Sequence, residues 1–215
     1  MMIKRERYLE EIRKVMGKQV IKVILGMRRV GKSTLLLQIQ EELLTQGVEK
    51  EQIISLNFEW LEFESLKEYK VLYEYIESKK VNGKKSYVFL DEVQEVEGFE
   101  KVVNSLNSKG ETEVFITGSN SKLLSGELAT YLTGRFYTIE VLPLSYKEVS
   151  EGFLKTEDVF LEYLRTGGMP GKFQFEEDRT AKNYLMDMYQ SILLRDIVKR
   201  YNIRDVDLLQ RFMLY

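Results

Sequence analysis

A glycine-rich stretch near the amino terminus carries the residues best suited to chemistry. Residues 26–33 read Gly-Met-Arg-Arg-Val-Gly-Lys-Ser and fit the Walker A pattern, G-x-x-x-x-G-K-[ST]. The glycines let backbone N–H groups turn toward a phosphate, and a helix beginning at Lys32 adds its positive dipole end. Lys32 can reach the β- and γ-phosphates, and Ser33 can place its hydroxyl on Mg²⁺. The predicted phosphate-binding residues are Gly26, Met27, Arg28, Arg29, Val30, Gly31, Lys32, Ser33 and Thr34.

The alternative for this stretch is a glycine-rich turn with no ligand. It is disfavoured because the match lies between a strand pattern and a helix pattern, as a phosphate loop requires. Arg28 and Arg29 lie inside the loop, where they either add charge near the phosphates or project toward a partner.

Two carboxylates close an apolar run further along the chain, in "YVFLDEVQ". In an open parallel sheet, ligands bind at the carboxyl ends of the strands. We expect Asp91 to hold the Mg²⁺ shell and Glu92 to polarise a water for attack on the γ-phosphate. The alternative is a strand that ends in two solvated acids, and the phosphate loop upstream favours the catalytic interpretation. Glu92 also argues against a small-molecule kinase, which needs no water-activating base.

Polar side chains also close the next apolar run, "FITGSN". Thr117, Ser119 and Asn120 there can orient the attacking water or sense the γ-phosphate. The alternative is an ordinary helix N-cap, for which Ser119 is well suited. Both interpretations stay open, and one residue could serve both roles.

The elements that must position these residues alternate between strand and helix patterns. Strand-type runs lie at 20–26, 52–60, 85–94, 112–120 and 134–145, and helical patterns at 5–16, 32–46, 65–80, 120–133 and around Val102, Val103 and Leu106. Such alternation implies an α/β fold with a parallel sheet and helices on both faces. Strand signals stop near residue 150, after a capping-box pattern at Ser145 and Glu148. We expect an α/β core at 1–150 and a helical subdomain at 151–215.

The composition excludes several kinds of site. The chain has no Cys and no His, so disulfides, Cys/His zinc sites and Ser-His-Asp nucleophiles are excluded, and a metal must bind oxygens, which favours Mg²⁺. The formal net charge is −2, but residues 1–32 hold ten Lys or Arg against three Glu. These basic residues form either a solvated helix face plus a phosphate loop, or a basic edge facing an anionic partner. With no signal-peptide pattern and no apolar membrane-span window, we expect a cytoplasmic protein.

The series "GMRRVGKST", "FLDEVQ", "ITGSNSKLL", "LTGRFYTIEVLPLSYKE" and "GGMP" resembles the AAA+-type P-loop ATPases of bacteria and archaea. More narrowly, it resembles a family in which an ATPase core precedes a winged-helix-like domain. The resemblance implies an additional-strand P-loop fold with sheet order 5-1-4-3-2 and hydrolysis of ATP with Mg²⁺. ATP rather than GTP also agrees with the absence of an Asn-Lys-x-Asp guanine-reading motif.

Two further positions follow from the resemblance. Arg135, in "TGRF", is either an arginine finger acting on the γ-phosphate of a neighbouring subunit in a homo-oligomer or a structural arginine paired with an acid. Pro170, in "GGMP", resembles a G-x-P element whose proline packs near the adenine, and the alternative is a plain turn between two helices. The chain ends in an apolar helical pattern without a cap, so we expect a cut before a C-terminal domain.

Three functional hypotheses therefore stand. The first is an ATPase that couples hydrolysis, through Lys32, Ser33, Asp91 and Glu92, to a conformational change. The second is a nucleotide-controlled signalling switch that holds ATP or ADP tightly and turns over slowly. The third is a DNA-binding initiator or loader-like module, in which DNA would be bound through the missing C-terminal domain.

Overall fold

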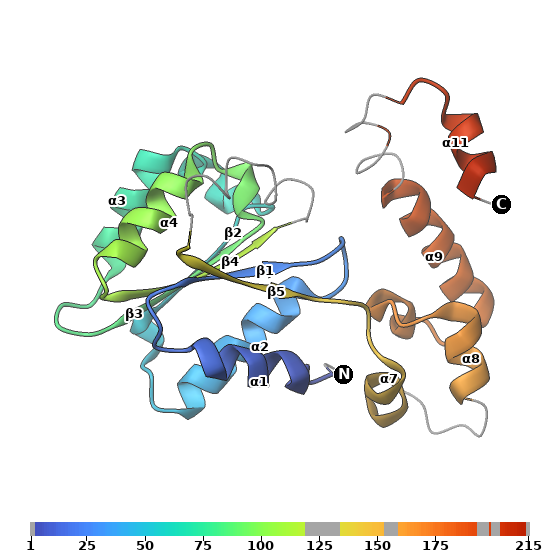
Figure 1. The fold of residues 1–215 in the computed structure, drawn as a ribbon, viewed down its shortest axis with the longest axis horizontal. Helices are drawn as coiled ribbons and strands as arrows, with labels where there is room; N and C mark the ends of the chain where they lie inside the picture. The colour runs from blue at the N-terminus through green and yellow to red at the C-terminus, as the bar shows by residue number, and fades with distance from the viewer. Residues whose placement is uncertain (1–2, 119–133, 153–158, 193–197, 199–202, 214–215) are drawn as a thin grey trace.

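The computed structural model describes residues 3–118, 134–152, 159–192, 198 and 203–213 (Figure 1). At its centre lies a five-stranded sheet in which every pairing is parallel. The strands are β1 (Ile21–Leu25), β2 (Ile53–Asn57), β3 (Ser86–Asp91), β4 (Thr112–Gly118) and β5 (Phe136–Glu140). Their order is β2-β3-β4-β1-β5, which confirms the expected 5-1-4-3-2 order read from the opposite edge.

The central strands are buried on both sides because helices cover both faces of the sheet. Every residue of β1 and β4 is buried, whereas the edge strands β2 and β5 include exposed residues. One face carries α1 (Glu6–Val15) and α2 (Lys32–Thr45), and the other carries α3 (Tyr69–Lys79) and α4 (Phe99–Ser108) (Figure 1). The three-layer α/β architecture expected from the alternating pattern is confirmed.

A separate hydrophobic cluster packs under each pair of helices. Leu35 and Ile39 of α2 lie against Phe89 and Phe115, whose rings stack with centroids 4.6 Å apart. On the opposite face, buried side chains of α3 and α4 pack on β2, β3 and β4, among them Leu72, Ile76, Val103, Leu106, Val88 and Val114. The carboxyl ends of the strands are thereby held in fixed register at one edge of the sheet.

Some predicted boundaries differ from the structure. The run at 52–60 ends as a strand at Asn57, and three short 3-10 helices follow or flank the strands: η1 (Lys50–Gln52), η2 (Leu61–Leu66) and η3 (Val93–Glu95). The helix expected from residue 65 begins only at Tyr69, because the Glu68 side chain accepts the N–H groups of Lys70 and Val71 and caps it there. The run at 134–145 is a strand only as far as Glu140.

Beyond β5 the described residues contain no strand. They form α7 (Tyr146–Gly152), α8 (Val159–Thr166), the 3-10 helix η4 (Pro170–Gln174), α9 (Asp178–Ile192) and α11 (Val206–Met213). The predicted capping box is present: the Ser145 N–H and hydroxyl both donate to Glu148 Oε2 at 2.8 Å. A boundary near residue 150 stays a prediction, although Leu144, Val149 and Val159 share one cluster and so group α7 with the later helices.

Two expectations fall beyond what can be described. The helix predicted at 120–133 lies outside the described residues, as do residues 153–158 and 193–197 of the expected helical subdomain. Within the described ranges, no helix is both long and apolar enough to cross a membrane.

Candidate functional site

The glycine-rich loop joins the carboxyl end of β1 to the start of α2. A Cβ at Gly26 would lie 2.5 Å from the Val141 carbonyl oxygen, so the loop can leave the sheet here only as glycine. Arg29 and Gly31 both have positive φ, 62° and 99°, and Gly31 is the N-cap of α2. Left-handed residues close to a helix start turn successive N–H groups to one side, which suits an anion.

Lys32 lies at the mouth of this loop with only 4% of its surface exposed. Its Nζ donates to the carbonyl oxygens of Gly26 and Met27, each at 3.2 Å, and lies 3.4 Å from Glu92 Oε1. The ammonium therefore bridges the loop and the end of β3. It occupies the place where a cation can approach a phosphate bound by the loop.

Three neighbouring strands converge on Asp91, which ends β3. Its Oδ1 accepts the Thr117 hydroxyl from β4, and its Oδ2 accepts the Asn57 amide from β2 at 2.9 Å. Burial raises the pKa of the Asp91 carboxyl, and hydrogen bonds from Ser33 and Thr117 partly oppose that shift. The carboxylate is thus fixed beside Ser33 of the loop.

Glu92 is held in an unusual backbone conformation next to Asp91. Its φ of 52° and ψ of 46° are left-handed, which is strained for a residue with a side chain. Its N–H donates to Thr117 Oγ1 at 3.0 Å, and its Oε2 accepts the Gln94 amide at 2.5 Å. Both carboxylate oxygens therefore have partners, since Oε1 faces Lys32.

The other wall of the site comes from the helices that follow β5. A cavity of about 600 Å³ is lined by the loop and by residues of η4 and α9, among them Pro170, Gly171, Tyr184 and Met188. That volume lies in the range of cavities that hold small molecules and cofactors. The Arg29 guanidinium lies 5.8 Å from the Tyr184 ring centroid and donates to its hydroxyl at 3.4 Å. The loop and α9 are therefore in direct contact.

Most of the residues predicted from sequence come together here. Those that line the cavity are Arg28, Arg29, Gly31, Lys32, Ser33, Thr34, Glu92 and Pro170. Gly26 and Met27 face Lys32 through their carbonyl groups, whereas the Val30 side chain is fully buried in the core, so only its backbone can serve the site.

Arg135 lies apart from this cavity. It immediately precedes β5, at the amino-terminal edge of the sheet, and its Nη1 donates to Asn104 Oδ1 at 2.9 Å. It therefore cannot act on a nucleotide in its own subunit, and a role across a subunit interface stays a prediction. Ser119 and Asn120 lie outside the described residues.

Sequence reasoning missed several residues of the site, among them Asn57, Tyr184, Met188 and Gln94. Asn57 ends β2 as Asp91 ends β3, but the longer runs expected at 52–60 and 85–94 did not reveal that shared position. Tyr184 and Met188 lie four residues apart in a helical pattern, so one face of α9 could have been assigned to a ligand wall. Gln94 offered no signal, because its contact with Glu92 depends on the short 3-10 turn.

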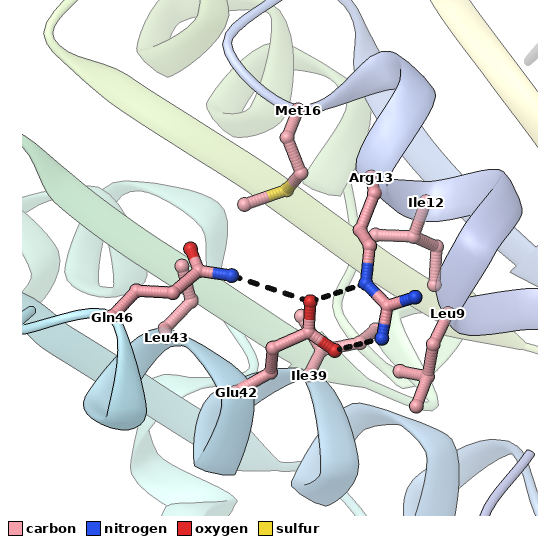
Figure 2. A pocket seen from close by; sticks show the side chains of 8 residues that line it. All are labelled: Leu9, Ile12, Arg13, Met16, Ile39, Glu42, Leu43 and Gln46. Carbon is pink, nitrogen blue, oxygen red and sulfur yellow. Dashed lines mark hydrogen bonds and ion pairs between the residues drawn. The ribbon is translucent and has the colours of Figure 1, made fainter. Parts of the chain in front are cut away.

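A second, smaller crevice of about 160 Å³ lies between α1 and α2 (Figure 2). Its lining is mainly apolar, and Arg13 donates to Glu42 from Nε at 2.6 Å and from Nη2 at 2.9 Å. Because this arginine is already paired, the crevice offers no free cation for a phosphate.

The oxygen donors of the main cavity fit Mg²⁺. This ion is usually held by one or two carboxylates together with phosphate oxygens and water, and Asp91 and Ser33 supply one carboxylate and one hydroxyl side by side. Among the described residues, no group of three or more Asp and Glu side chains could hold a metal alone. Phosphate oxygens and water would supply the remaining ligands of such an ion.

Comparison with known proteins agrees with this geometry. Residues 18–150 match the family described as the AAA domain. An uncharacterized protein of Haemophilus influenzae is 38% identical over 221 aligned positions, covering all of this chain and 55% of that protein. One of Methanocaldococcus jannaschii is 36% identical, covering 86% of this chain and 44% of that protein. The chain thus spans about half the length of these curated relatives.

Among solved structures, the Hsp104 subunit of a Saccharomyces cerevisiae Hsp104:casein complex superposes with a TM-score of 0.50. The superposition covers 70% of this chain and 28% of that one, at 14% identity. Similarity at this level of identity supports the fold alone.

Proposed function

The chain belongs to the AAA-domain family of P-loop ATPase-like proteins, and from that premise we propose that it binds ATP with Mg²⁺ and hydrolyses it. One observation carries the proposal. The glycine-rich loop, Lys32 and Glu92, which lies some 60 residues further along the chain, meet at one cavity, and Asp91 is hydrogen-bonded to Ser33 of that loop. The cavity combines a loop suited to binding an anion, the Lys32 ammonium and the Glu92 carboxylate, which we propose as the general base.

The binding step depends on groups already directed at the cavity. The start of α2 presents its N–H groups to the phosphates, and Lys32 would exchange its two loop carbonyls for phosphate oxygens. Asp91 and Ser33 would hold Mg²⁺, which neutralises charge on the phosphate oxygens when it is bound. Pro170 and Tyr184 form the far wall, where the nucleoside would lie.

The hydrolytic step is assigned to Glu92. In this structure one of its oxygens faces Lys32 and the other accepts Gln94. When Lys32 turns to the phosphates, Oε1 becomes available to accept a proton from the attacking water. The strained backbone at Glu92 aims the side chain toward the loop rather than along the strand.

The switch hypothesis is a second candidate, favoured by the contact between Arg29 and Tyr184. A nucleotide between the loop and α9 would be enclosed by both parts of the chain, which slows release.

The chain spans 55% and 44% of the length of its two curated relatives. The activity and partners of the whole protein, binding to DNA included, are therefore also proposals.

ATP turnover of the wild type and of Glu92→Gln tests the proposal. The variant should keep its affinity for ATP and lose about 10²- to 10⁴-fold in turnover, the range for a lost general base. Unchanged turnover would place the base elsewhere. Tight binding with almost no wild-type turnover would favour the switch.

The same assay addresses assembly. Turnover per protomer should be measured across a wide range of protein concentrations. A specific rate that rises with concentration would mean that the site is completed between subunits and would make Arg135 the leading finger candidate. A flat rate would mean that one subunit suffices.

A further inference from the structure

Arg5 is a buried arginine that joins three segments far apart in the sequence. It precedes α1 and is 3% exposed. Its Nη1 donates to the Val30 carbonyl at 3.2 Å, its Nη2 donates to the Leu142 carbonyl at 2.7 Å, and its Nε lies 2.8 Å from Glu148 Oε1. One guanidinium therefore contacts the phosphate loop, the segment after β5 and the first turn of α7.

The contact with Val30 determines which way a loop peptide faces. In a planar trans peptide, the carbonyl of Val30 and the N–H of Gly31 point in opposite directions. Arg5 holds the carbonyl on the side of α1, so the Gly31 N–H faces the other side, and Gly31 lines the cavity. Since Gly31 is conformationally permissive, its own sterics do not fix this peptide. The arginine supplies the constraint.

The other end of Arg5 is tied to the helices after β5. Glu148 uses Oε2 to accept both Ser145 donors at the start of α7 and presents Oε1 to Arg5. The Leu142 carbonyl is the third partner. Because α7 packs on α8 through Val149 and Val159, this network extends into the part of the chain that supplies the second cavity wall.

We propose that Arg5 is a positioning residue for phosphate binding, which orients the Gly31 N–H toward the phosphates and couples that orientation to the placement of α7. The proposal rests on the proposed function, in that it requires the cavity to bind a nucleotide. It assigns Arg5 no contact with the nucleotide. The guanidinium acts through the Val30–Gly31 peptide on one side and through Glu148 on the other.

The distinguishing readout is dependence on phosphate. A merely structural arginine would affect adenosine and ADP alike, whereas one that aims a phosphate-binding N–H affects ADP alone. The dissociation constant of Mg-ADP is measured by titration calorimetry, and that of adenosine by displacement of a fluorescent ADP analogue. Arg5→Lys and Arg5→Met should weaken ADP binding about 10- to 100-fold, the range for a hydrogen bond to a charged acceptor, and leave adenosine within about twofold.

The link to α7 is tested with Glu148→Gln, which keeps an oxygen for the Ser145 cap and removes the charge facing Arg5. It should weaken ADP binding in the same direction, and the double variant with Arg5→Met should bind no worse than Arg5→Met alone. Where Arg5→Met fails to fold, Arg5→Lys and Glu148→Gln carry the test.

The matched control is an arginine–carboxylate pair away from the cavity, Arg13 of α1 and Glu42 of α2 (Figure 2). Arg13→Met and Glu42→Gln should leave the ADP affinity unchanged. Equal losses for ADP and adenosine, no loss in any Arg5 variant, or fully additive effects at Arg5 and Glu148 would each overturn the inference alone. A wild-type chain that binds no ADP would overturn the proposed function and this inference with it.

Discussion

A buried ion pair at the amino-terminal edge of the sheet gives the sharpest stability prediction. Lys22 of β1 and Glu113 of β4 are 0% and 4% exposed, and their Nζ and Oε1 atoms lie 2.6 Å apart. Glu113 also accepts the Gly17 N–H at 2.8 Å and lies 2.7 Å from the half-exposed Lys85. The change to make is Glu113→Gln, which preserves shape and removes the charge.

The expected loss in the free energy of unfolding comes from Lys22, which stays buried after its charged partner is removed. Lys22 would stay fully buried, with the Lys18 carbonyl and the new amide oxygen at position 113 as neutral acceptors in place of a charged partner. Removing one member of a buried pair typically costs about 3–5 kcal/mol, because the other charge is left uncompensated. For a domain of this size that corresponds to a fall in Tm of roughly 6–20 °C.

The loss should also depend on pH. Burial alone would raise the pKa of Glu113, but hydrogen bonds from Lys22 and Lys85 outweigh it and hold the pKa below its ordinary value. A carboxyl with a lowered folded-state pKa stabilises the fold above its unfolded-state pKa, about 4.3 for glutamate, and this stabilisation is lost as pH falls through the folded-state pKa. The gap between wild type and Glu113→Gln should therefore shrink on acidification.

Urea unfolding at pH 7 and at successively lower pH measures both effects. Lys22→Met combined with Glu113→Gln should be more stable than Glu113→Gln alone, since it removes the orphaned charge. A loss below about 1 kcal/mol at pH 7, or a gap that grows on acidification, would refute the reasoning. Lys85→Ala serves as control, because an exposed partner contributes at most about 1 kcal/mol.

Three further predictions concern the cavity and its surroundings. Lys32→Ala should abolish nucleotide binding by removing the cation at the mouth of the loop, and retained micromolar ATP affinity in calorimetry would argue against the phosphate-loop assignment. Gly26→Ala should weaken both ADP binding and stability, the latter by about 1–3 kcal/mol in urea unfolding, because its Cβ would meet the Val141 carbonyl at 2.5 Å; wild-type behaviour would mean that the loop can shift freely. Arg135→Ala should leave ATP affinity unchanged and lower turnover at least about tenfold only at protein concentrations that raise the wild-type rate, whereas an equal loss at all concentrations would contradict a role between subunits.

The sequence predicted those parts of the site that are written as local patterns. The loop and the acids after an apolar run are short motifs, whereas the strand order was implied by the resemblance to the AAA+-type ATPases. Their meeting at one edge follows from the parallel sheet. Pro170 also lines the cavity, and it was predicted from the family resemblance rather than from a local pattern.

The other contacts described above join residues far apart in the sequence, and no residue spacing predicts them. The amide of Asn57 reaches Asp91 across 34 positions, and Arg5 reaches Leu142 across 137. The basic excess of residues 1–32 was interpreted as a solvated helix face plus a phosphate loop, or as a basic edge facing an anionic partner. Lys32 does belong to the loop, whereas Arg5 and Lys22 are buried with partners inside the fold. Charge counts do not distinguish a solvated cation from one that pins the backbone, because burial is decided by tertiary packing.

The edge of the cavity also carries the single tryptophan of the chain. Trp60 is 58% exposed, its ring stacks on Phe63 at 6.3 Å, and it directly follows Glu59, which lines the cavity. The emission of an indole ring shifts with local polarity, and all tryptophan emission of this chain would come from Trp60. The wild-type chain thus contains its own optical reporter at the edge of the cavity, so the kinetics of ligand binding there can be followed by stopped-flow fluorescence without a label.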